Sequence, residues 1–144
     1  MEVKRGKKIL VMGLPSSGKT HIARMIANEI DCQHYDADIV RAVANDWEFC
    51  YEGRRRQAQR MAELAVAQSI RGKHVVCSFI APTEELRRIF KPDILVYCTR
   101  TATRHYESTN AIFKEPTHYD ANYTGGNSWD VVREMQQALE VKGD

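Results

Sequence analysis

One short stretch near the start of the chain, GLPSSGKT at residues 13–20, has the residue types and spacing of a phosphate-binding loop. It matches the pattern G-x-x-x-x-G-K-[ST] in full, and it lies between an apolar run and an amphipathic segment. Its two glycines allow the chain to curl so that successive backbone N–H groups point at a bound triphosphate. The lysine offers a positive charge to the β- and γ-phosphates, and the last hydroxyl can bind Mg²⁺. The residues expected to bind ATP are Gly13, Ser16, Ser17, Gly18, Lys19 and Thr20.

The loop alone does not specify the reaction, because switches, motors and kinases share it. A switch GTPase needs a guanine-reading motif such as N-K-x-D, and the sequence has none. A motor ATPase usually has an acidic residue after a later apolar strand, but the run VVCSFI at residues 75–80 ends without one. The short chain and these two absences favour a kinase that acts on a small molecule.

Two carboxylates one residue apart, Asp36 and Asp38, follow the next strand-like segment. At a strand end that faces a triphosphate, one carboxylate can orient or deprotonate an attacking hydroxyl, and either can hold Mg²⁺ through its waters. We expect Asp36 to be catalytic and to share a metal with Thr20, while Asp38 contacts the substrate. Arg41, one helical turn beyond Asp38, can pair with it or bind an anionic substrate. The structural alternative is that Asp38 caps a helix, Asp36 lies in a turn and Arg41 is solvated.

A basic segment, FCYEGRRRQAQR at residues 49–60, comes next. Arg54 and Gln57 share one face of a predicted helix there. An arginine with an amide one turn away suits a phosphate or sulfate together with the edge of a base. An exposed, charged helix face is the alternative.

A polar stretch, TRTATRHYESTNAIFKEP at residues 99–116, follows a later strand. Kinases with alternating strands and helices commonly close a mobile lid at this place, with arginines that reach the transferring phosphoryl group. We therefore expect a lid at about residues 100–116, with Arg104 as a catalytic arginine and Arg100 beside it. An ordinary surface excursion is the alternative.

Alternating strand and helix patterns must position these residues. Short apolar runs predict strands at 7–12, 32–36, 73–80, 93–99 and 117–123. Helical spacing predicts helices at 21–30, 38–45, 53–70 and 84–90, with Thr83 as a cap, and a last helix capped by Ser128. The fold class expected is therefore α/β, in three layers, with a mostly parallel sheet of about five strands covered by helices on both faces. In such sheets ligands bind at the carboxyl ends of the strands, which is where the candidate site residues fall.

Composition is that of an ordinary globular chain of 144 residues, 43% apolar and 28% charged, with a net charge of +2. We expect one domain over residues 1–144. The charge pattern does not indicate nucleic-acid binding, and no apolar run is long enough for a membrane span or a signal peptide. We expect a cytoplasmic protein with reduced cysteines, because no C-x-x-C pair or zinc-ligand cluster occurs. The histidines show no catalytic pairing pattern.

Four sequence blocks in matching order give the chain a resemblance to the adenylylsulfate (APS) kinase family. They are GLPSSGKT; DADIVR, where the family has D-G-D-N-[VI]-R; EFCYEGRRRQAQRMAELA, where the family has F-S-x-x-D-R-x-x-N-I-R-R-x-x-E-V-A; and SFIAP, where the family reads F-I-S-P. The resemblance covers about residues 9–82. It implies a kinase that uses ATP and Mg²⁺ to phosphorylate the 3′-hydroxyl of adenosine 5′-phosphosulfate, and a possible homodimer.

The resemblance also implies roles for single residues. Asp36 matches the acid that orients the acceptor hydroxyl, while Phe49 and Arg54 match contacts to the adenine and the phosphosulfate end. The positions expected to bind the acceptor are Asp38, Arg41, Phe49, Arg54, Gln57, Ile80 and Ala81.

Three departures from the family pattern bear on the acceptor. Gln57 replaces the family asparagine, Ala81 replaces the family serine, and the K-G-L-Y-K-K run of the lid is absent. Two alternatives stay open, and these changes motivate the first of them. The first is a kinase for another hydroxyl acceptor, such as a small metabolite, a nucleoside or nucleotide, or a modified base. The second is a non-catalytic nucleotide-binding module.

Overall fold

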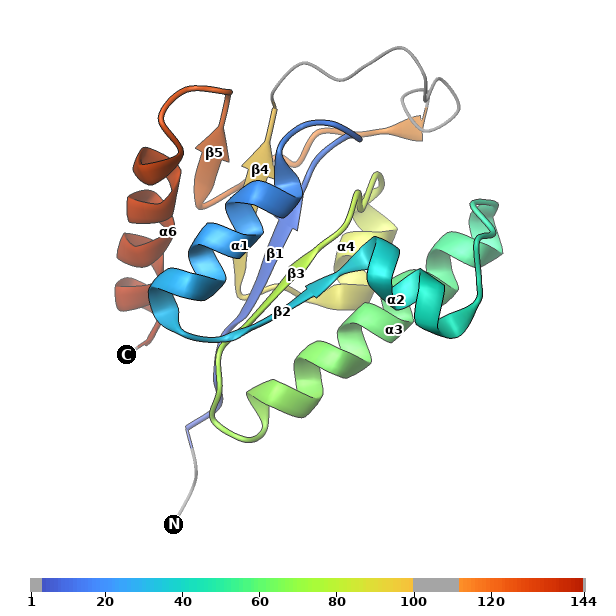
Figure 1. Cartoon of the computed structure of the whole chain (residues 1–144), viewed down its shortest axis with the longest axis horizontal. Coiled ribbons are helices and arrows are strands. Elements are labelled where there is room, and N and C mark those ends of the chain that lie inside the picture. Colours follow the sequence, from blue (N-terminus) through green and yellow to red (C-terminus); the bar gives the residue numbers. More distant parts are fainter. Residues whose placement is uncertain (1–3, 100–111, 144) are drawn as a thin grey trace.

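The computed structural model describes residues 4–99 and 112–143, which form a five-stranded parallel sheet between two layers of helices (Figure 1). The strands are β1 (Lys8–Met12), β2 (Gln33–Asp36), β3 (Val75–Ser78), β4 (Ile94–Cys98) and β5 (Ala121–Tyr123). Their order across the sheet is β2-β3-β1-β4-β5, and all four pairings are parallel. The carboxyl ends of the strands therefore meet at a single edge of the sheet.

Helices cover both faces of this sheet, as Figure 1 shows. One face carries α1 (Lys19–Ile30) and α6 (Ser128–Gly143), and the other carries α3 (Tyr51–Ser69) and α4 (Glu84–Phe90). The short α2 (Ala37–Ala44) follows β2 directly at the carboxyl edge. Within the described part of the chain, no helix is long and apolar enough to cross a bilayer.

Central strand β1 illustrates why this sequence folds into three layers. Ile9 and Val11 belong to the core under α1 and α6, while Leu10 and Met12 belong to the core under α3 and α4. All four side chains are fully buried. Each contributes about 1.5–3 kcal/mol through removal of apolar surface from water. A strand that is buried on both faces needs a continuous apolar run, which is what residues 9–12 provide.

The expected fold class is confirmed, with small shifts at the ends of elements. The last strand covers only Ala121–Tyr123 rather than seven residues from 117. Ser128 is not the cap of the last helix, so that prediction is wrong. Instead Asn127 Oδ1 accepts a hydrogen bond from the Trp129 N–H at 2.9 Å, and Ser128 is the first helical residue. All four cysteines are free thiols, as expected.

Candidate active site

The glycine-rich loop at residues 13–18 connects β1 to α1 at the carboxyl edge of the sheet. A Cβ atom at Gly13 would come within 2.4 Å of the Cys98 carbonyl oxygen, and Gly18 has a φ of 96°. Both positions therefore require glycine. Helix α1 begins directly after the loop, so its first N–H groups and its positive dipole end face the loop mouth. The buried hydroxyl of Ser17 has no partner within the described part of the chain.

Lys19 is the first residue of α1, and its side chain folds back over the loop. Its Nζ atom donates to the Leu14 carbonyl oxygen at 3.0 Å. Burial lowers the pKa of Lys19, while the negative charges of Asp38 and Asp36 act in the opposite direction. An ammonium group with little water around it binds phosphate oxygens more strongly than an exposed one, because the local dielectric constant is low. The geometry therefore suits the phosphate-binding role expected for this lysine.

Asp36 is the last residue of β2 and lies beside the loop. Its Oδ1 atom accepts from the Thr20 hydroxyl at 3.1 Å and from the Ser78 hydroxyl at 3.2 Å, and its Oδ2 accepts from the Asp38 N–H at 3.2 Å. Asp36, and not Asp38, therefore caps α2. The structural alternative named the wrong aspartate as the cap, and the capping residue is also the one that contacts the loop.

Ser78 and His34 were not expected near the site. Ser78 is the last residue of β3 and is buried, and its hydroxyl lies 2.8 Å from His34 Nε2. Burial lowers the pKa of His34, with a smaller opposing effect from Asp36. Both contacts join different strands and depend on the register that pairs His34 with Val76 and Asp36 with Ser78. No sequence motif encodes such a pairing.

Arg41 leaves α2 toward the start of α3 and is only 4% exposed, which excludes the solvated role of the structural alternative. Its Nη1 donates to the carbonyl oxygens of Asp46 and Glu48, at 2.9 and 3.1 Å. The guanidinium lies over the ring of Phe49, 4.2 Å from the centroid. Burial lowers the pKa of Arg41, although the guanidinium remains a cation at neutral pH.

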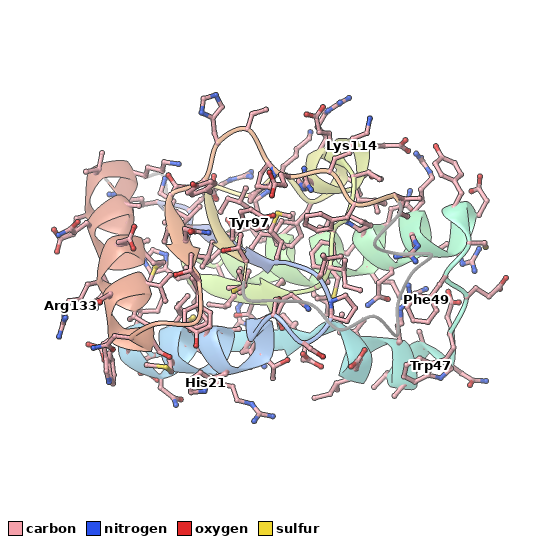
Figure 2. The ribbon with its side chains drawn as sticks, turned by 90° about the horizontal axis from the view of Figure 1, so that it is seen from above. His21, Trp47, Phe49, Tyr97, Lys114 and Arg133 are labelled. Atoms are coloured by element: carbon pink, nitrogen blue, oxygen red, sulfur yellow. The ribbon has the colours of Figure 1, made fainter. Side chains whose placement is uncertain are left out.

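Phe49 and Arg54 form the rim of the same region. The Arg54 Nε donates to the Phe49 carbonyl oxygen at 2.7 Å, and its guanidinium carbon lies 5.5 Å from the ring centroid. The ring of Phe49 is about half exposed. In Figure 2 the labels of Phe49 and Trp47 lie at one end of the molecule and Arg133, on α6, at the other. An aromatic ring with two nearby arginines suits a ligand that is both aromatic and anionic.

Gln57 is buried, and both ends of its amide already have protein partners. Its Nε2 donates to the Ala37 carbonyl oxygen at 3.0 Å, and its Oε1 accepts from Arg60 Nη2 at 2.8 Å. Arg60 in turn pairs with Asp46 at 3.0 Å. The amide thus connects α3 to the start of α2.

The segment after β3, residues 79–82, forms a further wall of the site. Ala81 has a φ of 45°, which is uncommon for a residue with a side chain. Its carbonyl oxygen accepts from Arg87 Nε at 3.0 Å, and Arg87 also donates to the Lys114 carbonyl oxygen. The Lys114 N–H donates to the Pro82 carbonyl oxygen at 2.7 Å. Sequence reasoning did not single out Arg87, because it stands beside a second, exposed arginine on the same short helix.

These walls enclose a cavity of about 500 Å³. Eleven of the expected site residues line it, namely Ser16, Lys19, Thr20, Asp36, Asp38, Arg41, Phe49, Arg54, Gln57, Ile80 and Ala81. Gly13, Ser17 and Gly18 lie in the loop but not in the cavity lining. Arg100 and Arg104 fall outside the described residues, as does most of the expected lid.

A glycine-rich loop that precedes a helix, at the carboxyl edge of a parallel sheet and facing a cavity, is the arrangement of the P-loop kinases. Residues 5–99 match the family model of adenylylsulphate kinase. The chain therefore belongs to the adenylylsulphate kinase family.

Known proteins that resemble the chain include a probable adenylyl-sulfate kinase of Aeropyrum pernix, which is 30% identical over 95 residues. That match covers 62% of this chain and 52% of the relative, so the chain spans about half the length of the curated relative it matches. The APS kinase of Mycobacterium tuberculosis, solved in complex with AMPPNP and APS, has a TM-score of 0.80 at 20% identity, over 94% of this chain and 98% of that one. An unliganded sugar kinase of Janibacter sp. has a TM-score of 0.75 at 18% identity, over 94% and 95%. At these identities the two structures support the fold alone.

Proposed function

We propose that the chain transfers the γ-phosphoryl group of ATP to the 3′-hydroxyl of adenosine 5′-phosphosulfate. The observation that carries the proposal is the arrangement of one cavity: Lys19 and Thr20 lie on one side, Arg41, Phe49 and Arg54 lie on the other, and Asp36 contacts the first side directly. The first side suits a triphosphate. The second suits a planar ring with an anionic group. Membership in the adenylylsulphate kinase family supports the same acceptor.

The residues around Thr20 suit Mg²⁺. Thr20 and Asp36 offer oxygen atoms 3.1 Å apart beside the phosphate loop, and hard cations prefer oxygen ligands. Among the described residues no cluster of three His, Cys, Asp or Glu side chains exists. This fits a cation that is held by a few protein oxygens and completes its shell with phosphates and water. Bound there, Mg²⁺ would neutralise charge on the β- and γ-phosphates.

The protein's own groups then have distinct tasks. Lys19 stabilises negative charge on the moving phosphoryl group, and Asp36 orients the acceptor hydroxyl and accepts its proton. Arg41 and Arg54 hold the anionic end of the acceptor, and the exposed part of the Phe49 ring stacks on its base. We further propose that Arg104, which lies outside the described residues, reaches the phosphoryl group in the closed site.

An acceptor panel tests the proposal. The protein is incubated with ATP labelled in the γ-phosphoryl group, Mg²⁺ and one acceptor at a time, and the label is followed by chromatography. The panel contains adenosine 5′-phosphosulfate, AMP, adenosine, a sugar and shikimate. Transfer to adenosine 5′-phosphosulfate with a kcat/KM well above that for the others supports the proposal. Nucleotide binding without transfer to any acceptor would favour the non-catalytic module.

A different hydroxyl acceptor is the second candidate, and the state of Gln57 favours it. Its amide nitrogen donates one N–H to Ala37 and its oxygen accepts from Arg60, so this buried amide has at most one N–H left for the edge of an adenine. Ala81 adds no hydroxyl to the cavity wall. A site with fewer polar contacts discriminates less between acceptors, because fewer groups are left unpaired by the wrong one. Transfer to AMP or to a sugar in the same panel would support this candidate.

A further inference from the structure

A chain of hydrogen bonds runs from His34 on the outer strand of the sheet to the phosphate loop. His34 Nε2 lies 2.8 Å from Ser78 Oγ, Ser78 Oγ lies 3.2 Å from Asp36 Oδ1, and Thr20 Oγ1 lies 3.1 Å from the same oxygen. Side chains two residues apart on a strand point to the same face, and the parallel register brings Ser78 beside Asp36. The three strand residues therefore meet Thr20 on the face that α1 covers.

The position of the proton on the His34 ring determines the direction of these hydrogen bonds. A serine hydroxyl carries one proton, and an ionised carboxylate only accepts. If Ser78 donates to Asp36, then His34 must carry its proton on Nε2 and donate to Ser78. If Nε2 lacks a proton, Ser78 donates to the histidine and turns a lone pair toward Asp36. The ring of His34 therefore decides whether Asp36 keeps its donor from the sheet.

The bond from Ser78 matters because the other side-chain donor to this oxygen has a second task. Thr20 is the hydroxyl that the loop motif assigns to the cation, so a bound nucleotide competes for it. The Asp38 N–H holds only Oδ2. Ser78 is then the side chain that keeps Oδ1 of Asp36 in place, and it is itself held by His34.

We propose that Ser78 and His34 are positioning residues for phosphoryl transfer, and that His34 acts through the hydroxyl of Ser78. The proposal rests on the proposed function, because it assumes that Asp36 orients the acceptor. A group that orients a reactive carboxylate typically changes activity about 10- to 100-fold when it is removed. If the pair served only to stabilise the fold, its removal would lower the melting temperature. The apparent kcat would then fall only as far as the folded fraction of the protein falls.

Kinetics of four single variants and one double variant test this. Ser78→Ala removes the hydroxyl, His34→Leu removes the ring nitrogen, and His34→Gln keeps an N–H donor. Gln33→Leu is the matched control, because Gln33 is an exposed neighbour on the same strand. We expect Ser78→Ala and His34→Leu to lower kcat about tenfold with less than about a twofold change in the KM for ATP. His34→Gln should keep most of the activity, and the control should keep all of it.

The double variant Ser78→Ala with His34→Leu gives the sharpest result. If His34 acts only through Ser78, the double variant should be no slower than Ser78→Ala alone. Independent losses that multiply to about a hundredfold would overturn the proposal. A loss of kcat that merely follows the melting temperature, or an equal loss in Gln33→Leu, would do so as well.

Binding of a non-hydrolysable ATP analogue separates this proposal from the proposed function. If the wild type phosphorylates no acceptor, the proposed function fails. The affinity for the analogue can still be measured with and without Mg²⁺, and this difference reports on Asp36 because Asp36 is expected to help hold the cation. Ser78→Ala and His34→Leu should then weaken the Mg²⁺ dependence by the same factor, and the double variant by no more. An unchanged Mg²⁺ dependence in both single variants would overturn the positioning role.

Discussion

Gln57 Nε2 donates a hydrogen bond to the carbonyl oxygen of Ala37 at 3.0 Å, and Ala37 is the first residue of the helix that Asp36 caps. A side chain of α3 thus fixes the start of α2, directly beside the proposed catalytic carboxylate. The same amide accepts from Arg60 and so joins the helix start to the pair between Arg60 and Asp46. Gln57 therefore supports the shape of the acceptor side of the cavity.

Replacement of Gln57 by methionine should destabilise the protein. Gln57→Met keeps the length and most of the volume of the side chain but leaves the Ala37 carbonyl and Arg60 without their partner. We expect the free energy of unfolding to fall by about 1–3 kcal/mol, measured by urea denaturation. Gln59→Met is the control, because Gln59 is exposed on the same helix and should change stability by less than about 0.5 kcal/mol. Equal effects in the two variants would contradict a supporting role for the Gln57 amide.

Replacement of the two adjacent arginines of α4 should have very different effects on stability. Arg87 is buried and donates to the carbonyl oxygens of Ala81 and Lys114, whereas Arg88 is exposed and pairs with Glu84 across one helical turn. We expect Arg87→Ala to cost about 3 kcal/mol, because the buried Ala81 carbonyl and the partly buried Lys114 carbonyl lose a charged donor. The KM for the acceptor should rise as well, since Ala81 forms part of the cavity wall.

Arg88→Ala supplies the comparison, with an expected change of about 0.5 kcal/mol or less. Urea denaturation gives both values, and steady-state kinetics give the KM for ATP and for the acceptor. A rise in the KM for ATP alone would contradict the assignment of Arg87 to the acceptor wall.

Much of the fold could be predicted because its signals are local. The run at residues 9–12 is apolar without interruption, as a strand buried on both faces requires, and the loop motif defines where α1 begins. The ends of elements were less certain for an equally local reason. Asn127 and Ser128 are both good capping residues, so the sequence could not decide between them.

The site was predictable as far as its residues follow strands. The place of Asp36 beside the loop could be predicted in this way, because the carboxyl ends of parallel strands share one edge. Ser78 was missed since its contacts reach 42 and 44 residues along the chain and depend on strand register. Gln57 could be predicted to lie near the site. That its amide binds the Ala37 carbonyl could not be predicted, because this contact depends on where the start of α2 lies relative to α3.

We expect His74 to make the folded protein less stable at acidic pH. Its Nδ1 accepts a hydrogen bond from the Lys7 N–H at 2.9 Å, which requires an unprotonated nitrogen. Burial lowers the pKa of His74, with smaller contributions from Lys7 and Lys4. The unfolded chain, with a histidine pKa of about 6.5, then binds the proton more readily than the folded one. The free energy of unfolding should therefore fall as the pH drops through about 6.5 toward the lowered pKa.

Unfolding by urea at a series of pH values from about 7.5 to 5 measures this slope. His74→Gln keeps an acceptor but does not titrate, so its slope should be shallower than that of the wild type. His34 contributes in the same direction, because burial lowers its pKa too, so part of the slope should remain. An equal slope in the wild type and in His74→Gln would exclude His74 as a cause.

Two substitutions at Asp36 separate its role in folding from its role in chemistry. Asn caps helices about as well as Asp, so Asp36→Asn should keep α2 in place, whereas Asp36→Ala should lose about 1 kcal/mol of stability with the cap. Neither variant can accept a proton from the acceptor hydroxyl. We expect both to lower kcat by about 10²–10⁴ while ATP binding, measured by calorimetry, survives. If Asp36→Asn turned over at the wild-type rate and Asp36→Ala did not, the carboxylate would serve only as a cap, and the base for phosphoryl transfer would have to be sought elsewhere in the cavity.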